Sequence, residues 1–433
     1  MSYIFSRHPF PFRRLCRWLG LAVLARLWAE TPPSPLSLED VLTRVAQRDP
    51  RLLAEATAAQ AADGRLEQAG KRPNPMLSVA VEDFGGNGRT RGGQTMELTV
   101  QASQLVERGD KPACRVALAE SERTVAAGEY AWQFSSRQVS AAAAYVRALA
   151  EQAKLGFATE QLDLAREAAA SVERRRAAAV ATAAEAARAR AALVLARAEH
   201  ARAAASYKVA LLALVGTWGG DASEVAGLAG RLRLPPKPPT PQEFLVAASN
   251  VPGSRLATMA AEVESRRAAL ALERARAVPD FTVGAGMRRL YEGPSYSFVM
   301  GASIPLVFRD DNSGNIRSAQ TLVRAAEQAL KAAEVEQRNQ LTAACLELAA
   351  AHAQATELRK EALPAAEEAC VAARRAFDQG VATFLEVTDT RRALLSLRRD
   401  ILQAEVAAFE ALLRAEGISD PRLTRTRALL VAE

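Results

Sequence analysis

The hydrophobic positions along the chain change their period in a fixed order, and this order occurs twice. Stretches with the period of an amphipathic helix surround two short regions in which apolar and polar or small residues alternate. In the first region Leu77, Val79 and Val81 occupy every second position, and Phe281 and Val283 begin the same pattern in the second. Such alternation is typical of strands with one apolar face. The sequence therefore predicts two β-hairpins set between helices.

Each alternating region contains two runs separated by a glycine-containing tip. The tips fall at residues 85–93 and around Gly293 and Pro294, where turn residues close a hairpin. Strands of about ten residues with an apolar face have the length and pattern of outer-membrane barrel strands. A half-buried soluble hairpin has the same pattern, so the alternation alone leaves both interpretations open.

Very long helical patterns follow the hairpins. From about Asn312 to Asp378, apolar residues recur at heptad spacing, and the return helix over about 383–416 is half as long. About 65 residues at 1.5 Å each span roughly 100 Å. Pro364 is expected to kink the first of these helices, because its ring removes a backbone hydrogen bond. Helices with such alanine-rich seams need neighbours, either in a coiled-coil bundle or in a closed α-barrel.

Four landmarks recur in the same order at an offset of 200 to 204 residues. They mark a helix start with a capping box, a strand start, a strand end and a helix stop. The pairs are Ser37 and Thr240, Pro75 and Pro279, Ala102 and Ala302, and Gly216 and Gly417. Both glycines are expected at helix C-termini in the left-handed conformation. The ordered recurrence predicts a duplicated unit of helix, β-hairpin and long helix pair.

The expected fold is therefore mainly α with a small β part. We divide the chain into a signal peptide over residues 1–29, a first repeat over 36–217 and a second repeat over 240–417. A linker or equatorial segment over 218–239 contains consecutive prolines, which hold the backbone extended. A C-terminal tail occupies residues 418–433.

The N-terminal segment has the pattern of an export signal. Arginines, among them Arg13 and Arg14, precede the apolar run from Leu19 to Leu27, and Ala29 precedes Glu30 as a small exit residue. This pattern predicts export from the cytoplasm. Arg26 interrupts the apolar run and keeps a second interpretation open, in which the segment is an amphipathic helix of a cytoplasmic protein.

Composition and charge narrow the class of protein. Hydrophobic residues make up 49% of the chain but aromatic residues only 5%, which favours extended, closely packed helices. The formal charge is +7, and residues 1–29 hold five arginines and no acid, so the remainder carries only +2. A nearly neutral chain lacks the basic footprint of a nucleic-acid-binding protein. We expect no nucleic-acid partner.

The reactive residues are scattered. The sequence has three histidines and four cysteines without CxxC spacing, and no nucleophile, phosphate loop or acid–base pair stands out. Cys345 and His352 share a helix face, but about 10.5 Å of helix axis separates them, too far to hold one metal ion. We therefore expect no enzymatic activity, no cofactor and no metal site. After the signal, no apolar run approaches the roughly 20 residues of a membrane-spanning helix.

Several local runs indicate a family. They are Leu36–Asp40, Arg72–Pro75, Val81–Gly86, Pro279–Gly284, Ser303–Pro305, Phe377–Gly380 and Leu385–Asp389. Over about residues 36–417 the chain resembles the TolC-like outer-membrane factor family, and the Glu-Asp-Phe-Gly-Gly run at 82–86 resembles its cobalt-zinc-cadmium efflux (CzcC-like) branch.

The resemblance implies a homotrimer with a helical α-barrel across the Gram-negative periplasm. Four strands from each protomer would share a twelve-stranded transmembrane β-barrel in the lipid of the outer membrane. It also implies a passive duct of a tripartite efflux system, with a periplasmic adaptor (membrane fusion protein) and an inner-membrane pump of the resistance-nodulation-division type. Heavy-metal cations of the Co/Zn/Cd or Cu/Ag type are the expected cargo. The alternative is a periplasmic coiled-coil scaffold or adaptor without a transmembrane barrel.

The resemblance also implies site residues. Glu386 and Asp389 lie at i and i+3 on the return helix and match the paired acids at the periplasmic entrance of the family's duct. Spacing alone also fits acids that complement a helix N-terminus. The turn expected to meet the adaptor consists of Gly380, Val381, Ala382 and Thr383. The corresponding turn of the first repeat, within 175–190, lacks the family's glycine, which puts docking there in doubt.

Overall fold

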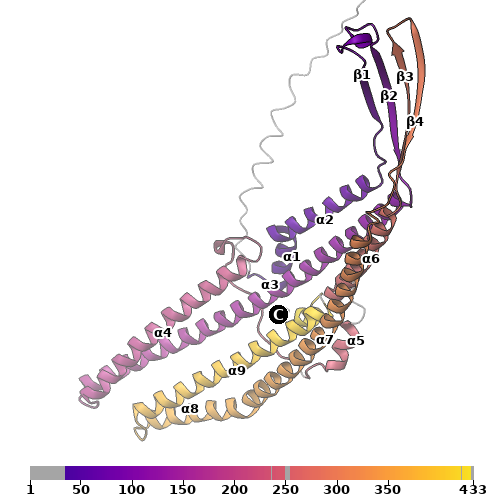
Figure 1. Ribbon diagram of the computed structural model, residues 1–433. Helices are drawn as coiled ribbons and strands as arrows, with labels where there is room; N and C mark the ends of the chain where they lie inside the picture. The colour runs from indigo at the N-terminus through magenta and orange to yellow at the C-terminus, as the bar shows by residue number, and fades with distance from the viewer. Residues whose placement is uncertain (1–34, 236, 249–253, 421, 431–433) are drawn as a thin grey trace, which may run out of the picture.

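A computed structural model of the protein describes residues 35–235, 237–248, 254–420 and 422–430. The predicted signal peptide lies outside the described residues. Helices dominate, and a small sheet stands at one end of the molecule (Figure 1). The helices and strands are α1 (Leu38–Arg48), α2 (Pro50–Ala69), β1 (Met76–Glu82), β2 (Glu97–Val106), α3 (Lys111–Ala177), α4 (Ala183–Val215), α5 (Pro241–Ala248), α6 (Arg255–Arg276), β3 (Phe281–Leu290), β4 (Ser295–Ser303), α7 (Ser313–Glu357), α8 (Leu363–Asp378), α9 (Phe384–Ser419) and α10 (Thr424–Leu429).

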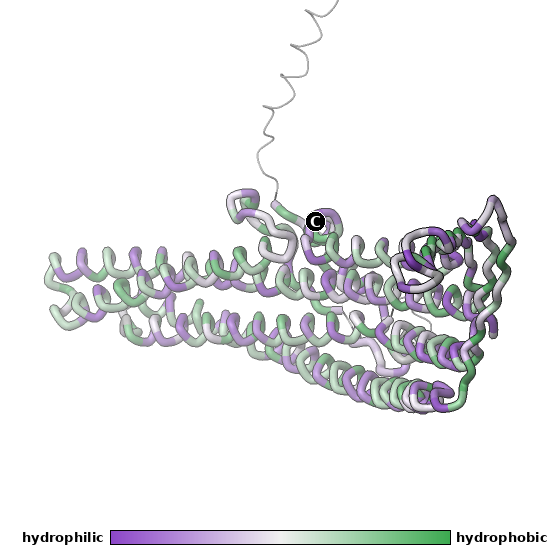
Figure 2. Tube along the Cα trace, turned by 45° about the horizontal axis from the view of Figure 1, so that its top comes forward, coloured by the Kyte–Doolittle hydropathy of each residue, from purple (hydrophilic) through white to green (hydrophobic). Residues whose placement is uncertain are grey.

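Two units of the same plan follow one another along the chain. The first contains α1, α2, the β1–β2 hairpin, α3 and α4, and the second contains α5, α6, the β3–β4 hairpin, α7, α8 and α9. The long helices run from the sheet to the opposite end of the molecule, where α3 turns into α4 and α8 turns into α9 (Figure 1). Polar and apolar residues alternate along all of these helices (Figure 2). The predicted fold class, mainly α with a small β part, is confirmed.

The two long outgoing helices differ in continuity. Helix α3 runs for 67 residues without a break. In the second unit, a π-helical turn over Leu358–Ala362 separates α7 from α8, and Pro364 is the second residue of α8. Proline cannot donate the backbone hydrogen bond to the preceding turn, and a wider turn makes room for its ring. A kink is expected at Pro364, and the structure has a π-helical turn just before it, a feature at which helices bend.

The predicted helix starts are confirmed. Ser37 caps α1, because its hydroxyl accepts from the Asp40 amide at 3.2 Å and its own amide donates to the Asp40 carboxylate at 3.0 Å. The Ser37 hydroxyl also donates to the Asp40 carboxylate at 2.6 Å, and this bond together with the one from the Ser37 amide lowers the pKa of Asp40. In the second unit, the Thr240 amide donates to the Glu243 carboxylate at 3.3 Å. Both pairs satisfy backbone donors that the helix itself leaves free.

The expected helix end at Gly216 is confirmed, but the left-handed conformation expected there and the helix end expected at Gly417 are wrong. Gly216 follows α4, but its φ of −61° is right-handed. Gly417 lies inside α9, and a Cβ there would come within 3.0 Å of Val139 on α3. Gly417 is therefore a site of close helix packing and not a helix end. The left-handed glycine after α4 is Gly219, with φ of 71°.

The main core lies where the helices of both units meet the segment that joins them. Tyr145 and Trp218 are almost completely buried there, and the Tyr145 hydroxyl donates to the Leu36 carbonyl at 3.1 Å. Burial raises the pKa of Tyr145 above its ordinary value. Leu228 and Leu232, within the predicted 218–239 segment, are also buried in this core. That segment therefore packs against the helices along part of its length.

The sheet joins the hairpins of the two units. Its strands are antiparallel in the order β1-β2-β3-β4, so that β2 pairs with β3 across the repeat. The register places Val79, Val100, Met287 and Phe298 side by side in one row. Because side chains alternate between faces, the apolar faces of all four strands coincide. Within the described residues, β1 and β4 each have one strand neighbour and form the edges.

Candidate functional site

The predicted docking turn lies at the end of the molecule farthest from the sheet (Figure 1). Gly380 has a φ of 78°, a left-handed conformation that glycine adopts without a steric penalty. The amides of Val381 and Ala382 both donate to the Ala376 carbonyl, at 2.9 and 3.1 Å. Val381 is 81% exposed, so the turn presents an uncovered apolar side chain.

The turn between α3 and α4 follows the same backbone path. The amides of Val180 and Ala181 both donate to the Arg175 carbonyl, at 2.8 and 3.2 Å. Ala179 takes the place of the glycine, with a φ of 58°. The missing glycine therefore does not change the shape of this turn. It places an alanine in a left-handed conformation, which costs about 1 kcal/mol.

Equivalent capping boxes follow both turns. The Thr383 amide donates to the Glu386 carboxylate at 2.8 Å, and the Glu386 amide donates to the Thr383 hydroxyl at 3.3 Å. In the first unit Thr182 and Glu185 make the same pair of bonds, at 2.8 and 3.2 Å. The bonds from Thr182 lower the pKa of Glu185. The carboxylate of Glu386, a predicted entrance residue, is thus directed back to the start of its own helix.

Asp389, the second predicted entrance acid, lies one turn further along α9. Its carboxylate pairs with Arg392 at 3.1 Å, and its side chain is 54% exposed. Glu386 is exposed as well. The structure therefore places both acids at the exposed start of one helix, as predicted. It gives each a separate local partner and does not bring the two carboxylates together.

The two helix pairs contact each other near their turns. The guanidinium of Arg175, beside the first turn, lies 4.9 Å from the ring centroid of Phe377, beside the second. Further along, Arg399 of α9 pairs with Glu199 of α4 at 3.0 Å. Cation–π and ionic contacts of this kind each contribute modestly at exposed sites. Together they connect the helical ends of the two units.

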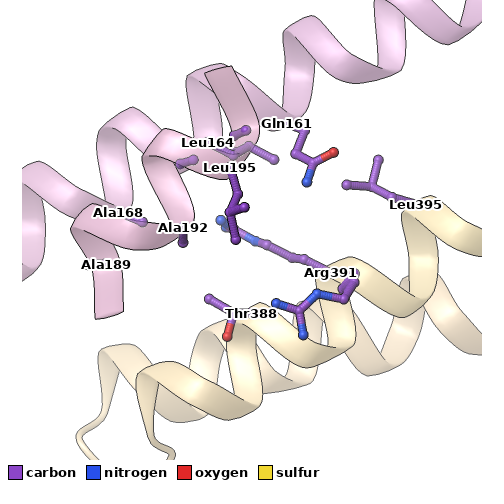
Figure 3. A pocket seen from close by; sticks show the side chains of 12 residues that line it. Gln161, Leu164, Ala168, Ala189, Ala192, Leu195, Thr388, Arg391 and Leu395 are labelled. Carbon is purple, nitrogen blue, oxygen red and sulfur yellow. The ribbon is translucent and has the colours of Figure 1, made fainter. Parts of the chain in front are cut away.

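A groove lies between α9 and the α3–α4 pair, next to the predicted entrance acids. It encloses about 160 Å³, and side chains from all three helices converge on it (Figure 3). Its lining consists of Gln161, Leu164, Ala165, Ala168, Ala189, Ala192, Leu195, Ala196, Thr388, Arg391, Arg392 and Leu395. The groove is not recognisable from the sequence, because its walls come from both repeats. The alanines of α4 that recur at three- and four-residue spacing are the local sequence feature that corresponds to one wall of the groove.

The two faces of the sheet have opposite character. On the apolar face Phe298 is 89% exposed and Met300 is 85% exposed. On the polar face Thr99 is only 7% exposed, and Arg288 donates to the Thr99 hydroxyl at 3.0 Å and to the Glu97 carboxylate at 2.6 Å. A sheet of a soluble protein covers its apolar face instead. This sheet presents its apolar face outward and uncovered.

An ion pair that the sequence analysis did not identify ties the sheet to the helices. The Lys111 ammonium at the start of α3 lies 2.6 Å from the Asp280 carboxylate and 2.7 Å from the Val278 carbonyl. The Arg108 amide also donates to Asp280, at 2.9 Å. Burial raises the pKa of Asp280, but the hydrogen bonds from Lys111 and Arg108 outweigh it and leave that pKa below its ordinary value. The contact joins the two units directly beneath the strands.

Among the described residues, no three His, Cys, Asp or Glu side chains are arranged to hold a metal ion. His352 Nε2 lies 2.7 Å from the Pro235 carbonyl, and Cys345 is buried, which raises the pKa of its thiol. Within the same part of the chain, no helix has both the length and the apolar character needed to cross a membrane.

The sequence and fold are similar to those of known proteins. The family described as outer membrane efflux protein matches residues 41–220 and 253–415. The cobalt-zinc-cadmium resistance protein CzcC of Cupriavidus metallidurans is 31% identical over 364 residues, which cover 84% of this chain and 85% of that protein. The nickel-cobalt-cadmium resistance protein NccC of Alcaligenes xylosoxydans xylosoxydans is 28% identical, covering 77% of each chain.

A solved structure shows the same fold. The outer membrane channel CmeC of Campylobacter jejuni superposes with a TM-score of 0.74 at 12% identity, covering 91% of this chain and 90% of that one. The long helices and the small four-stranded sheet thus belong to a fold that occurs in an outer membrane channel.

Proposed function

Because the chain belongs to the outer membrane efflux protein family, we propose that it forms the outer-membrane channel of a tripartite efflux system for heavy-metal cations. The sheet carries this proposal, because its apolar face is exposed while the polar face of β2 and β3 is partly buried. Contact with lipid would remove the apolar side chains from water and leave the polar face toward a lumen. A passive duct needs no catalytic group, so we propose neither an enzymatic activity nor a resident cofactor.

The edges of the sheet support a homotrimer. Strands β1 and β4 lie at the two edges, and such edges are not tolerated in contact with lipid because their backbone groups lack partners. Pairing of β4 with β1 of a second copy removes both edges. Three copies with four strands each close a twelve-stranded barrel. Exposed apolar residues on α4, among them Val194 and Val209, support a matching association of the helices into an α-barrel.

The relatives support the cargo. CzcC and NccC are named for resistance to cobalt, zinc, cadmium and nickel, and all of these metals occur as cations. We assign the present chain to the same substrate class, with copper and silver as further candidates. Selection of the metal belongs to the inner-membrane pump of the resistance-nodulation-division type, so the duct itself needs no ligand cluster.

The far end of the helices is the proposed periplasmic entrance. Glu386 and Asp389 from three protomers would form a ring of six carboxylates that attracts cations. The adaptor would bind the turn over 380–383, and the equal backbone of the turn over 179–182 supports docking there as well. Residues 1–29 would act as a signal peptide, 36–217 and 240–417 as the two repeats, 218–239 as the equatorial segment and 418–433 as the tail.

Metal tolerance of a strain that lacks the gene tests this proposal. We expect the deletion strain to lose growth at raised cobalt, zinc, cadmium or nickel, and the full-length chain to restore it. We also expect an adaptor to co-purify with the chain. Replacing Val381 and Ala382 with aspartate should reduce the amount of adaptor that co-purifies. If the deletion strain tolerates cobalt, zinc, cadmium, nickel, copper and silver as well as the parent strain does, the proposal that the channel exports heavy-metal cations is refuted. Recovery in the soluble periplasmic fraction would favour a coiled-coil scaffold instead.

A further inference from the structure

We propose that the groove between α9 and the α3–α4 pair is a binding site for a small aromatic carboxylate. The site lies within a single protomer, and its α9 residues begin at Thr388, between the two entrance acids (Figure 3). Side chains from three helices of one chain form the groove, so its existence does not depend on the proposed trimer or on the proposed cargo.

The size of the groove favours a single aromatic ring. It encloses about 160 Å³, and an apolar cavity of about 150 Å³ is known to hold benzene. Ala189 and Ala196 are each 2% exposed and leave space at its floor because they lack longer side chains. Leu164 and Leu395 supply apolar contacts on opposite sides. A planar apolar ring fits this lining better than a flexible polar chain does.

The charge of the groove favours an anion. Its lining contains two arginines and no acidic residue. Arg392 pairs with Asp389 at 3.1 Å. Arg391 is half-buried, and within the described part of the chain no acidic side chain forms an ion pair with it. A guanidinium binds a carboxylate through two parallel hydrogen bonds. Arg391 is therefore the residue that would hold the carboxylate, with the ring between α9 and the alanines of α4.

Fluorine NMR with 4-fluorobenzoate tests the site on the full-length protein in detergent. We expect line broadening that saturates for 4-fluorobenzoate, and at least tenfold weaker binding of 4-fluorobenzyl alcohol and 4-fluorobenzylamine. Arg391→Gln removes the charge, and Ala192→Leu fills the groove. Each should weaken 4-fluorobenzoate binding at least tenfold. Arg197→Gln is the matched control, because this arginine is exposed on α4 and does not line the groove.

Three results would overturn the proposal. Equal binding of the alcohol and the carboxylate would remove the role of Arg391. An equal loss in Arg197→Gln would indicate binding to the general positive surface. An absence of binding to the native protein would show that the groove is not a site for an aromatic carboxylate. The channel conductance of the same preparation is measured in parallel. Because the duct can conduct whether or not the groove binds a ligand, conductance tests the proposed function and ligand binding tests the groove.

Discussion

The acids at the start of α9 each serve a local structural role as well as the proposed functional one. Glu386 accepts from the Thr383 amide, and Asp389 pairs with Arg392. Glutamine can replace glutamate in a capping box, so Glu386→Gln combined with Asp389→Asn should keep α9 intact. We expect the double variant to form trimers, to lose cation selectivity in planar bilayers and to resist block by a trivalent cation.

Glu185→Gln is the control for this experiment, because Glu185 makes the same capping bonds in the first unit. Native selectivity in Glu185→Gln would separate the effect of charge at 386 and 389 from an effect of capping. Unchanged selectivity and block in the double variant would remove Glu386 and Asp389 from the entrance.

Asp280 should make the stability of the protein depend on pH. The pKa of Asp280 is lower in the folded state than in the unfolded state, where it is about 3.9. Its contribution to the free energy of unfolding is therefore complete above about pH 3.9, and it is lost as the pH falls through the folded-state pKa. Asp280→Asn leaves the largely buried Lys111 ammonium without its anionic partner, at a cost of about 3 kcal/mol at neutral pH. Thermal unfolding followed by circular dichroism should show a difference between native and variant that shrinks below about pH 4. A difference that is constant with pH would contradict this assignment.

At the scale of elements, the two helical turns differ in strain and not in shape. Ala179 and Gly380 both have positive φ, and a Cβ built on Gly380 meets no atom within 4 Å. Ala179→Gly should therefore relieve strain and stabilise the protein by about 1 kcal/mol, and Gly380→Ala should destabilise it by a similar amount. Chemical denaturation of both variants measures this. Effects of the same sign at both positions would show that backbone strain is not the cause.

The sheet offers a second test at this scale. Val79 lies on its exposed apolar face, whereas Ser78, one residue earlier on β1, lies on the polar face. Ser78 is in one cross-strand row with Gln101, Gly286 and Val299. A lysine facing lipid at mid-depth costs about 2 to 4 kcal/mol. We expect Val79→Lys and Phe298→Lys to reduce the assembled protein in outer-membrane fractions. Ser78→Lys should assemble normally, because no charged residue shares its row. Equal effects on both faces would show that the sheet does not contact lipid.

For the whole molecule, the prediction is a closed trimer that depends on strand pairing between copies. Edge strands β1 and β4 leave backbone donors and acceptors available for a neighbour. The protein from outer membranes should migrate as a trimer on an unheated gel and as a monomer after boiling. A monomer under both conditions, with no crosslinked trimer in native membranes, would refute the closed barrel.

The sequence by itself determined the elements and their order. Helix starts such as Ser37 with Asp40, strand alternation such as Leu77 and Val79, and the helix irregularity near Pro364 depend on residues close together in the chain. Hydrogen-bond geometry and side-chain period act over a few residues, so these features can be recognised without the fold. The duplication and the single apolar face of each strand followed from the same local patterns.

Only the tertiary structure decided which elements meet. The pairing of β2 with β3, the Lys111–Asp280 ion pair, the packing of Gly417 against Val139 and the groove beside Arg391 all join residues far apart in sequence. Local patterns carry no information about such partners, because many apolar or charged residues along the chain could satisfy the same group. The partners of Glu386 and Asp389 are different in kind, because Thr383 and Arg392 each lie only three residues from the acid that they contact, so these bonds do not depend on which elements meet.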